Sequence, residues 1–249
     1  MLKIKNFIFF SIFTLILVRH GQSEWNLKKR FTGWVDVDLT EQGKQEALKA
    51  GESIKKIKIN IDYFFSSFQL RAINTLKFIR NTLGDEKQFI RAWQLNERHY
   101  GSLTGLNKDE MKEKLGEKKI HEFRRSWDIK PDPLDRKNPY HPLNIEVYKD
   151  IPKENIPDTE SLKDTYERVM KFYVEEIQEK IKNDENILIS AHGNSIRALC
   201  KFLFKLDNQK ITLLEIPTGN PLLISLDSKQ NIKKCSYLDQ DRAKDLLVF

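Results

Sequence analysis

The sequence predicts an α/β fold, a three-layer sandwich in which helices flank a mostly parallel central sheet. Short apolar runs of strand length alternate along the chain with longer runs whose apolar residues recur at helical spacing. That alternation is typical of parallel strands joined by helical crossovers. The length of 249 residues suits one large domain, and we predict a single domain over residues 1–249.

Apolar runs rich in β-branched and aromatic residues define the expected strands. The run Thr-Leu-Ile-Leu-Val ends just before Arg19, and the similar run Asn-Ile-Leu-Ile-Ser lies far along the chain. In chain order, we expect strands at residues 14–18, 61–65, about 89–93, 186–190 and 221–226.

Helical spacing and capping residues define the expected helices. Thr40 carries the hydroxyl group of a typical N-cap and precedes a run that extends to about residue 56. We expect helices at residues 40–56, 70–83, 107–127, 160–182 and 195–206. Residues 128–158 hold six of the eight prolines, which predicts an irregular excursion over the face of the domain.

A mostly apolar run of twelve residues, 7–18, precedes Arg19. It is too short to span a bilayer, although its length suits the core of a signal peptide. The run leads directly into Arg-His-Gly without a small-residue cleavage site, so we interpret its end as a buried strand preceded by an apolar overhang. A start codon placed too early and a weak membrane contact stay open for residues 1–10.

The composition limits the classes of function. The chain has 43 Lys and Arg against 36 Asp and Glu, a net charge of +7, and 39% hydrophobic residues, which excludes a disordered chain. Two cysteines exclude a disulfide framework, so we expect a cytoplasmic protein without stable membrane association. Positive and negative residues are scattered along the whole sequence. The sequence has no basic stripe with interleaved aromatic residues, so we expect no nucleic-acid partner. A basic surface equally suits small polyanionic substrates.

Two expected strands end in the same way, because each is followed by His-Gly, at His20 and at His192. In open α/β sheets, ligands bind beyond the carboxyl ends of the strands. If these two strands lie side by side, both histidines face one pocket. The residues alone also allow two unrelated turn histidines, each followed by glycine for backbone reasons.

Arginines near these histidines point to phosphoryl transfer. Arg19 precedes His20, and Arg71 opens the helix that follows the expected strand at 61–65. Such cations hold an imidazole neutral and attract anions. A neutral imidazole is a competent nucleophile toward phosphorus, and arginine forks neutralise phosphoryl oxygens. The sequence contains no Walker-type glycine loop, so ATP is not the expected phosphoryl donor. We also expect no metal. Phosphoryl transfer through a phosphohistidine follows as a hypothesis.

The motif Leu-Val-Arg-His-Gly-Gln-Ser-Glu-Trp-Asn at residues 17–26 resembles the signature of the histidine phosphatase superfamily. The motifs Asn-Glu-Arg-His-Tyr and Arg-Arg are narrower and resemble the phosphoglycerate mutases that depend on 2,3-bisphosphoglycerate. The similarity extends in family order through residues 30–34, 66–72, 95–108, 123–127, 160–165, 191–195 and 216–219.

The resemblance implies an isomerase of glycolysis and gluconeogenesis that interconverts 3-phosphoglycerate and 2-phosphoglycerate. It implies 2,3-bisphosphoglycerate as the priming phosphate donor, no metal, and a homodimer or homotetramer. His20 would become phosphohistidine, and Glu97 would be the general acid and base. Arg19, Arg71 and His192 would clamp the phosphoryl group.

The same resemblance implies the residues that bind substrate. They are Gly21, Gln22, Ser23, Glu24, Trp25, Asn26, Thr32, Gly33, Arg98, His99, Tyr100, Lys108, Arg124, Arg125, Gly193 and Asn194. Without the resemblance, Glu97 is an ordinary surface carboxylate, and Arg124 and Arg125 belong to a solvated helix face.

Departures from the family pattern leave a related activity open. Gln22 and Gln94 stand where Glu and Arg are common, and the chain ends at Phe249 without the mobile Lys-rich tail of many members. A shorter tail would favour hydrolysis of phosphohistidine, so bisphosphoglycerate synthesis or phosphatase action at the same site is the alternative. Ser23, rather than Gly, resembles the mutases more than the synthases.

Overall fold

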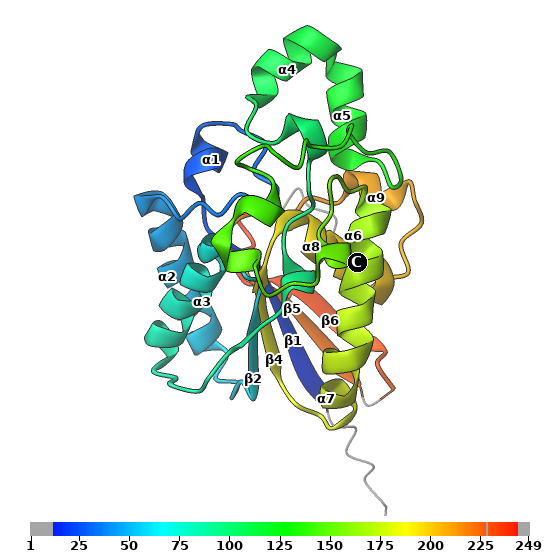
Figure 1. The fold of residues 1–249 in the computed structure, drawn as a ribbon. Helices are drawn as coiled ribbons and strands as arrows, with labels where there is room; N and C mark the ends of the chain where they lie inside the picture. Colours follow the sequence, from blue (N-terminus) through cyan, green and yellow to red (C-terminus); the bar gives the residue numbers. More distant parts are fainter. Residues whose placement is uncertain (1–11, 228, 244–249) are drawn as a thin grey trace, which may run out of the picture.

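The computed structural model describes residues 12–227 and 229–243 (Figure 1). The expected apolar overhang at residues 1–10 and the apolar chain end after residue 243 lie outside the described residues. Within the described part, no helix is both long and apolar enough to cross a membrane.

A six-stranded sheet in the order β3-β2-β4-β1-β5-β6 forms the centre of the molecule. The strands are β1 (Ile12–Arg19), β2 (Tyr63–Ser66), β3 (Ile90–Arg91), β4 (Ile187–Ala191), β5 (Leu222–Asp227) and β6 (Ile232–Tyr237). β1, β4, β2 and β3 pair in parallel, whereas β5 is antiparallel to β1 and to β6. The predicted mostly parallel sheet is confirmed.

Side chains of β1 alternate between two hydrophobic layers, as the period of a strand requires. Leu15 and Leu17 join the core beneath the helices that follow residue 160, whereas Ile16 and Val18 join the core on the opposite face. All four side chains are buried, which explains why this central strand is a continuous apolar run in the sequence.

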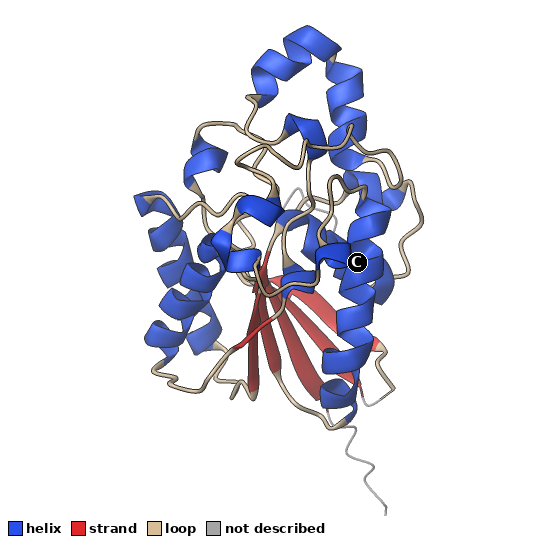
Figure 2. Ribbon diagram, viewed as in Figure 1, coloured by secondary structure: helices blue, strands red, loops and turns tan. Residues whose placement is uncertain are grey.

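Helices cover both faces of the sheet (Figure 2). On one face lie α2 (Glu41–Lys56) and α3 (Leu70–Leu83). Thr40 caps α2, because its side chain accepts a hydrogen bond from the Gly43 N–H, as predicted. On the other face lie α6 (Leu162–Phe172), α7 (Gln178–Lys182) and α8 (Gly193–Leu203), with a π-helical turn, Tyr173–Ile177, between α6 and α7.

The predicted helix over 107–127 is wrong, because the chain forms two helices there. α4 (Lys108–Leu115) and α5 (Glu117–Arg125) meet at Gly116, whose φ of 87° and ψ of 143° leave the helical region. The sequence also did not predict β6 or the short helices α1 (Glu24–Leu27) and α9 (Lys210–Leu213).

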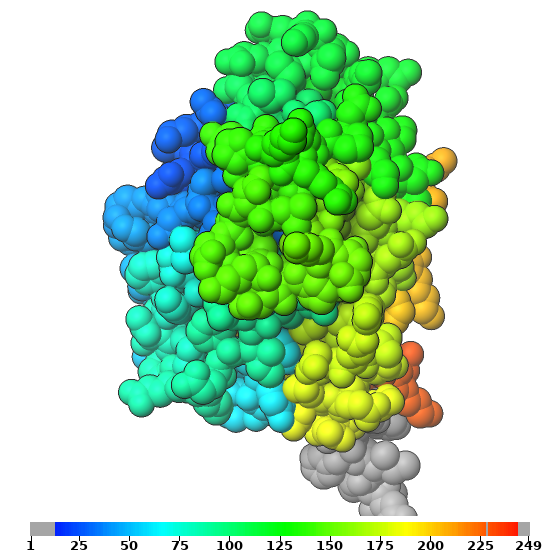
Figure 3. Space-filling model, viewed as in Figure 1, coloured from blue at the N-terminus to red at the C-terminus, as the bar shows by residue number. Residues whose placement is uncertain are grey.

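The proline-rich excursion over 128–158 holds three short 3-10 turns. Its residues Tyr148, Ile151 and Ile156 pack on Trp34, and the Tyr148 hydroxyl donates a 2.6 Å hydrogen bond to the Trp34 carbonyl. Figure 3 shows this green segment covering the middle of one face of the molecule. The excursion is therefore irregular in its backbone but anchored by apolar contacts.

Candidate active site

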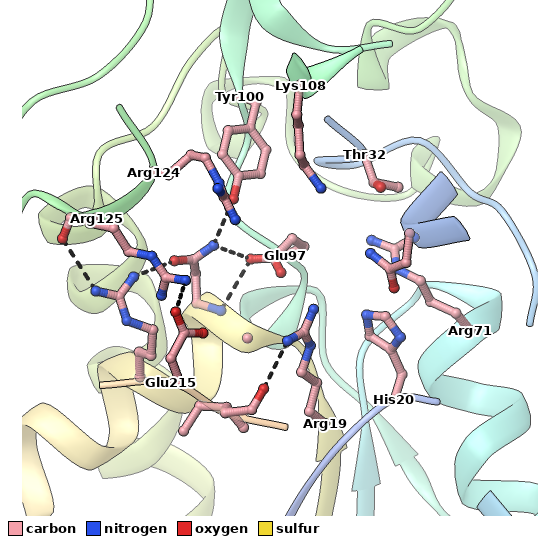
Figure 4. Close-up of a pocket in the computed structure, with 15 residues that line it drawn as sticks. Arg19, His20, Thr32, Arg71, Glu97, Tyr100, Lys108, Arg124, Arg125 and Glu215 are labelled. Atoms are coloured by element: carbon pink, nitrogen blue, oxygen red, sulfur yellow. Dashed lines mark hydrogen bonds and ion pairs between the residues drawn. The ribbon is translucent and has the colours of Figure 1, made fainter. Parts of the chain in front are cut away.

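A pocket lies where β1 and β4 end, at the carboxyl edge of the parallel strands. Pairing of Arg19 with Ala191 places the two strand ends side by side, so His20 and His192 emerge together. Figure 4 shows His20 and Arg71 on one side of the pocket, Arg124 and Arg125 on the other, and Glu97 between them. The lining residues are Arg19, His20, Asn26, Thr32, Arg71, Glu97, Tyr100, Lys108, Arg124, Arg125, Gly193, Asn194, Arg197, Glu215 and Ile216.

His20 presents a neutral imidazole with a defined tautomer. Its Nδ1 lies 2.7 Å from the Gly21 carbonyl oxygen. Because a carbonyl oxygen only accepts, Nδ1 carries the proton and Nε2 keeps its lone pair. Burial, followed by the charges of Arg71 and Arg19, lowers the pKa of His20 well below its usual value. The ring is therefore poised as a nucleophile at neutral pH.

Glycines hold the His20 loop against helix α2. The Gly21 N–H donates a 3.1 Å hydrogen bond to the Thr75 hydroxyl. A Cβ atom on Gly21 would lie 2.1 Å from the Gly43 carbonyl oxygen, and one on Gly43 would lie 2.0 Å from the Gln22 carbonyl oxygen. Backbone meets backbone at this contact, so only glycine fits on either side.

Two arginines are fixed beside His20 by backbone carbonyls. Arg71, in the first turn of α3, donates through Nη1 to the Val35 carbonyl and through Nη2 to the Gly33 carbonyl, both at 2.9 Å. Arg19 Nη1 donates to the Ile216 carbonyl at 2.8 Å. These acceptors are neutral backbone carbonyls rather than carboxylates, which leaves both guanidinium groups suited to an anionic ligand.

His192 lies behind the pocket wall and next to His20. The two ring centroids are 5.0 Å apart, and His192 Nε2 lies 2.8 Å from the Ser67 hydroxyl oxygen. Burial, Arg71 and His20 lower the pKa of His192 well below its usual value. The two predicted histidines are thus brought together, although His192 itself is fully buried and does not line the pocket.

Glu97 is a buried carboxylate that faces the same space. Its Oε1 accepts hydrogen bonds from the Arg98 N–H at 2.8 Å and from Asn194 Nδ2 at 2.8 Å. The Asn194 side chain also donates to the Tyr100 hydroxyl at 3.2 Å. Glu97 is therefore held in place by amides, and its exposed fraction of 8% leaves it little contact with solvent.

Cations from the α4–α5 pair close the far side. Lys108 begins α4, and Arg124 and Arg125 end α5, so the two helices bring both ends of this segment to the pocket. Burial, followed by the charges of Arg124 and Arg19, lowers the pKa of Lys108. Arg125 forms an ion pair with Glu215 across the rim.

Several predicted residues support the pocket without lining it. Five of them, residues 21–25, form the turn after His20 and the start of α1. Gln22 faces α2, where its side chain accepts a 2.9 Å hydrogen bond from the Thr40 hydroxyl. Ser23 is the N-cap of α1, Glu24 is exposed in its first turn, and Trp25 packs edge to face on Tyr140.

Gly33, Arg98 and His99 are likewise outside the lining. Gly33 offers its carbonyl to Arg71, whereas Arg98 lies over the Tyr100 ring at 4.7 Å from its centroid. His99 is fully buried and turned toward His141, with ring centroids 6.1 Å apart. The structure therefore does not bring Arg98 and His99 to the pocket, because only the first and last residues of the segment 97–100 line it.

Sequence reasoning missed three lining residues, Arg197, Glu215 and Ile216. Arg197 follows Asn194 by three residues on α8, and its Nη1 donates a 2.9 Å hydrogen bond to the Asn194 side chain. That spacing puts both on one helix face, which is a signal available in the sequence. Glu215 and Ile216 come from a loop that only the tertiary structure brings to the rim.

The chain is similar to known proteins in sequence. The family model described as histidine phosphatase superfamily (branch 1) matches residues 15–141 and 137–236. A protein of Pelagibacter ubique named 2,3-bisphosphoglycerate-dependent phosphoglycerate mutase is 86% identical over 94% of this chain and 99% of its own length. A protein of the same name from Maricaulis maris is 46% identical over 93% of this chain and 96% of its own length.

The chain belongs to the phosphoglycerate mutase family of the histidine phosphatase superfamily. A solved phosphoglycerate mutase structure from Bacillus anthracis superposes with a TM-score of 0.67 at 21% identity, covering 93% of this chain and 95% of the other, which supports the shared fold. The family resemblance stated from the sequence is confirmed. The Arg-His-Gly motif begins at Arg19, the last residue of β1, and the second His-Gly pair begins α8.

Proposed function

We propose that the chain interconverts 3-phosphoglycerate and 2-phosphoglycerate through a phosphohistidine at His20, primed by 2,3-bisphosphoglycerate. The observation that carries this proposal is the His20 ring, whose Nδ1 binds the Gly21 carbonyl and whose Nε2 lone pair is available at a strongly cationic pocket. The names of the relatives support the choice of substrate and cofactor.

The residues present fit a ligand with two phosphates and a carboxylate. Two cations, Arg19 and Arg71, lie beside His20, and four more line the rest of the pocket, where they would hold the carboxylate and the second phosphate. The four are Lys108, Arg124, Arg125 and Arg197. Bound 2,3-bisphosphoglycerate would supply the phosphoryl group that primes the enzyme.

Each transfer forms one bond and breaks one bond. His20 Nε2 attacks phosphorus, the bond from phosphorus to the glycerate oxygen breaks, and Glu97 gives its proton to that oxygen. In the return transfer, the Glu97 carboxylate takes the proton of a substrate hydroxyl as that oxygen attacks the phosphohistidine. Arg19, Arg71 and His192 would stabilise the charge on the transferring group. Transfer to the free hydroxyl of a monophosphoglycerate gives a bisphosphoglycerate, and return of its other phosphate to His20 completes the isomerisation.

Coupling to enolase tests the proposal. Conversion of 3-phosphoglycerate to 2-phosphoglycerate is measured with and without 2,3-bisphosphoglycerate, in the wild type and in His20→Ala. His121→Ala, at an exposed position on α5, is the matched control. We expect strong stimulation by the bisphosphate that only His20→Ala abolishes. Release of phosphate without 2-phosphoglycerate would replace the mutase with a phosphatase at the same histidine.

A further inference from the structure

Arg168 and Glu160 form a buried ion pair that the proposed mechanism does not use. Their side chains are 9% and 4% exposed, and both oxygens of Glu160 accept from Arg168, through Nε at 2.6 Å and Nη2 at 3.0 Å. Arg168 lies on α6, and neither residue lines the pocket. A buried pair is costly to keep for stability alone, because desolvation offsets much of its attraction.

The remaining donors of Arg168 bind the backbone of the segment that carries Glu97. Nη1 donates to the Gln94 carbonyl at 2.5 Å and to the Asn96 carbonyl at 3.0 Å, and Nη2 donates to the Glu97 carbonyl at 3.0 Å. With its two bonds to Glu160, the guanidinium uses all of its five N–H groups. The guanidinium group therefore binds three backbone carbonyls of one short segment at the same time.

Glu160 holds the same segment from its other end. Its Oε2 accepts from the His99 N–H at 2.7 Å, and its own N–H donates to the His99 carbonyl at 3.0 Å. From the opposite side, the Gln69 side chain accepts from the Glu97 N–H at 2.9 Å. The backbone N–H and carbonyl of Glu97 are thus both fixed, and Arg168 supplies the bond to the carbonyl.

We propose that the Arg168–Glu160 pair is a positioning pair that sets the Glu97 carboxylate for proton transfer. This inference rests on the proposed function, in which Glu97 gives its proton to the departing oxygen. Lysine keeps the charge at position 168 but cannot form the planar fork, so it cannot bind three carbonyls and both carboxylate oxygens together. A displaced Glu97 would slow the step that needs its proton and leave His20 intact.

The leaving group separates positioning of Glu97 from general damage. An alkoxide leaving from a phosphoglycerate needs a proton, whereas p-nitrophenolate leaves from p-nitrophenyl phosphate without one. With either donor, the phosphoryl group is transferred to His20 Nε2 and one phosphorus–oxygen bond of the donor breaks. The experiment therefore compares steady-state phosphoglycerate turnover with the pre-steady-state burst of p-nitrophenolate, which reports phosphorylation of His20.

The variants are Arg168→Lys and Glu160→Gln, with Glu97→Gln as the reference for lost proton transfer. Arg136→Lys is the matched control, because Arg136 makes a similar fork on Asp158 at the surface with its side chain 65% exposed. We expect Arg168→Lys to lower kcat for phosphoglycerate by about 30- to 100-fold with little change in KM, and to lower the burst rate by less than about 3-fold. Arg136→Lys should change neither.

An equal loss in both reactions would overturn the inference, because it would show that the pair maintains the fold of the whole pocket. Unchanged phosphoglycerate turnover in Arg168→Lys would also overturn it. The proposed function fails separately, if the wild type makes no 2-phosphoglycerate. Phosphate release from 3-phosphoglycerate, which also expels an alkoxide, then replaces mutase turnover in the same comparison.

Discussion

Three histidines are buried in their neutral form. We therefore predict that the protein loses much of its stability at mildly acidic pH. Burial and neighbouring cations lower the pKa of His20 and of His192 well below 6.5, and burial and His141 lower the pKa of His99 to about 3. The unfolded chain therefore binds protons near pH 6.5 that the native protein does not bind. The contribution of these histidines to the free energy of unfolding is fully present above this pH and is lost as the pH drops below it.

The size of the loss follows from the number of protons. Between pH 7.5 and 5.5, a histidine that titrates at 6.5 only when unfolded costs about 1.4 kcal/mol, so the three together cost about 4 kcal/mol. Carboxylates with lowered pKa values, such as Asp158, start from 3.8 and titrate below this window. The histidines therefore dominate the change, which is a large part of a typical folding free energy.

Urea unfolding at pH 7.5, 6.5 and 5.5 measures this change through the free energy extrapolated to water. His99→Gln, outside the pocket, should reduce the pH-dependent loss by about one third, or about 1.4 kcal/mol. His121→Gln, at an exposed position on α5, serves as the control and should leave the loss as it is. A wild-type loss below about 1.5 kcal/mol would show that the histidines take up protons in the native state.

Three further substitutions test the packing and the site. Gly43→Ala should destabilise by about 1 to 3 kcal/mol in urea unfolding, because overlap with the Gln22 carbonyl outweighs a gain of about 1 kcal/mol in helix propensity. Tyr148→Phe leaves the buried Trp34 carbonyl without its hydroxyl donor and should cost about 1 to 3 kcal/mol, seen as a lower Tm. Arg71→Lys should lower kcat/KM for 3-phosphoglycerate by about 100-fold, measured by enolase coupling, because lysine lacks the fork.

The central strands and the flanking helices could be predicted because burial on both sides leaves a clear pattern. β6 escaped prediction because it is an edge strand, with Lys233 and Lys234 exposed, and such edges carry charge rather than a continuous apolar run. β3 was expected to be longer, but its two residues, Ile90 and Arg91, are both exposed. β3 and β6 are the two edge strands of the sheet, so the exposure of their side chains explains both errors.

The chemistry of the site could be predicted where one local motif carries both the residue and its direction. His20 and His192 each follow a strand that ends at the same edge of the sheet, so the strand pattern alone places them. Contacts between distant loops have no such signal. Glu215 meets Arg125 only because the loop after α9 packs against the end of α5, and Arg168 meets the Glu97 carbonyl from the far layer of helices.

The break between α4 and α5 at Gly116 brings Lys108 and Arg125 to the same pocket. A continuous helix over 107–127 would separate Lys108 from Arg125 by about 25 Å, at 1.5 Å per residue, too far for one glycerate ligand. The family resemblance placed both residues in one pocket, so the two predictions from the sequence were incompatible. The structure resolves the conflict through the left-handed φ of Gly116, which lets α5 fold back beside α4. A single glycine thereby brings both ends of the segment to the same anion site.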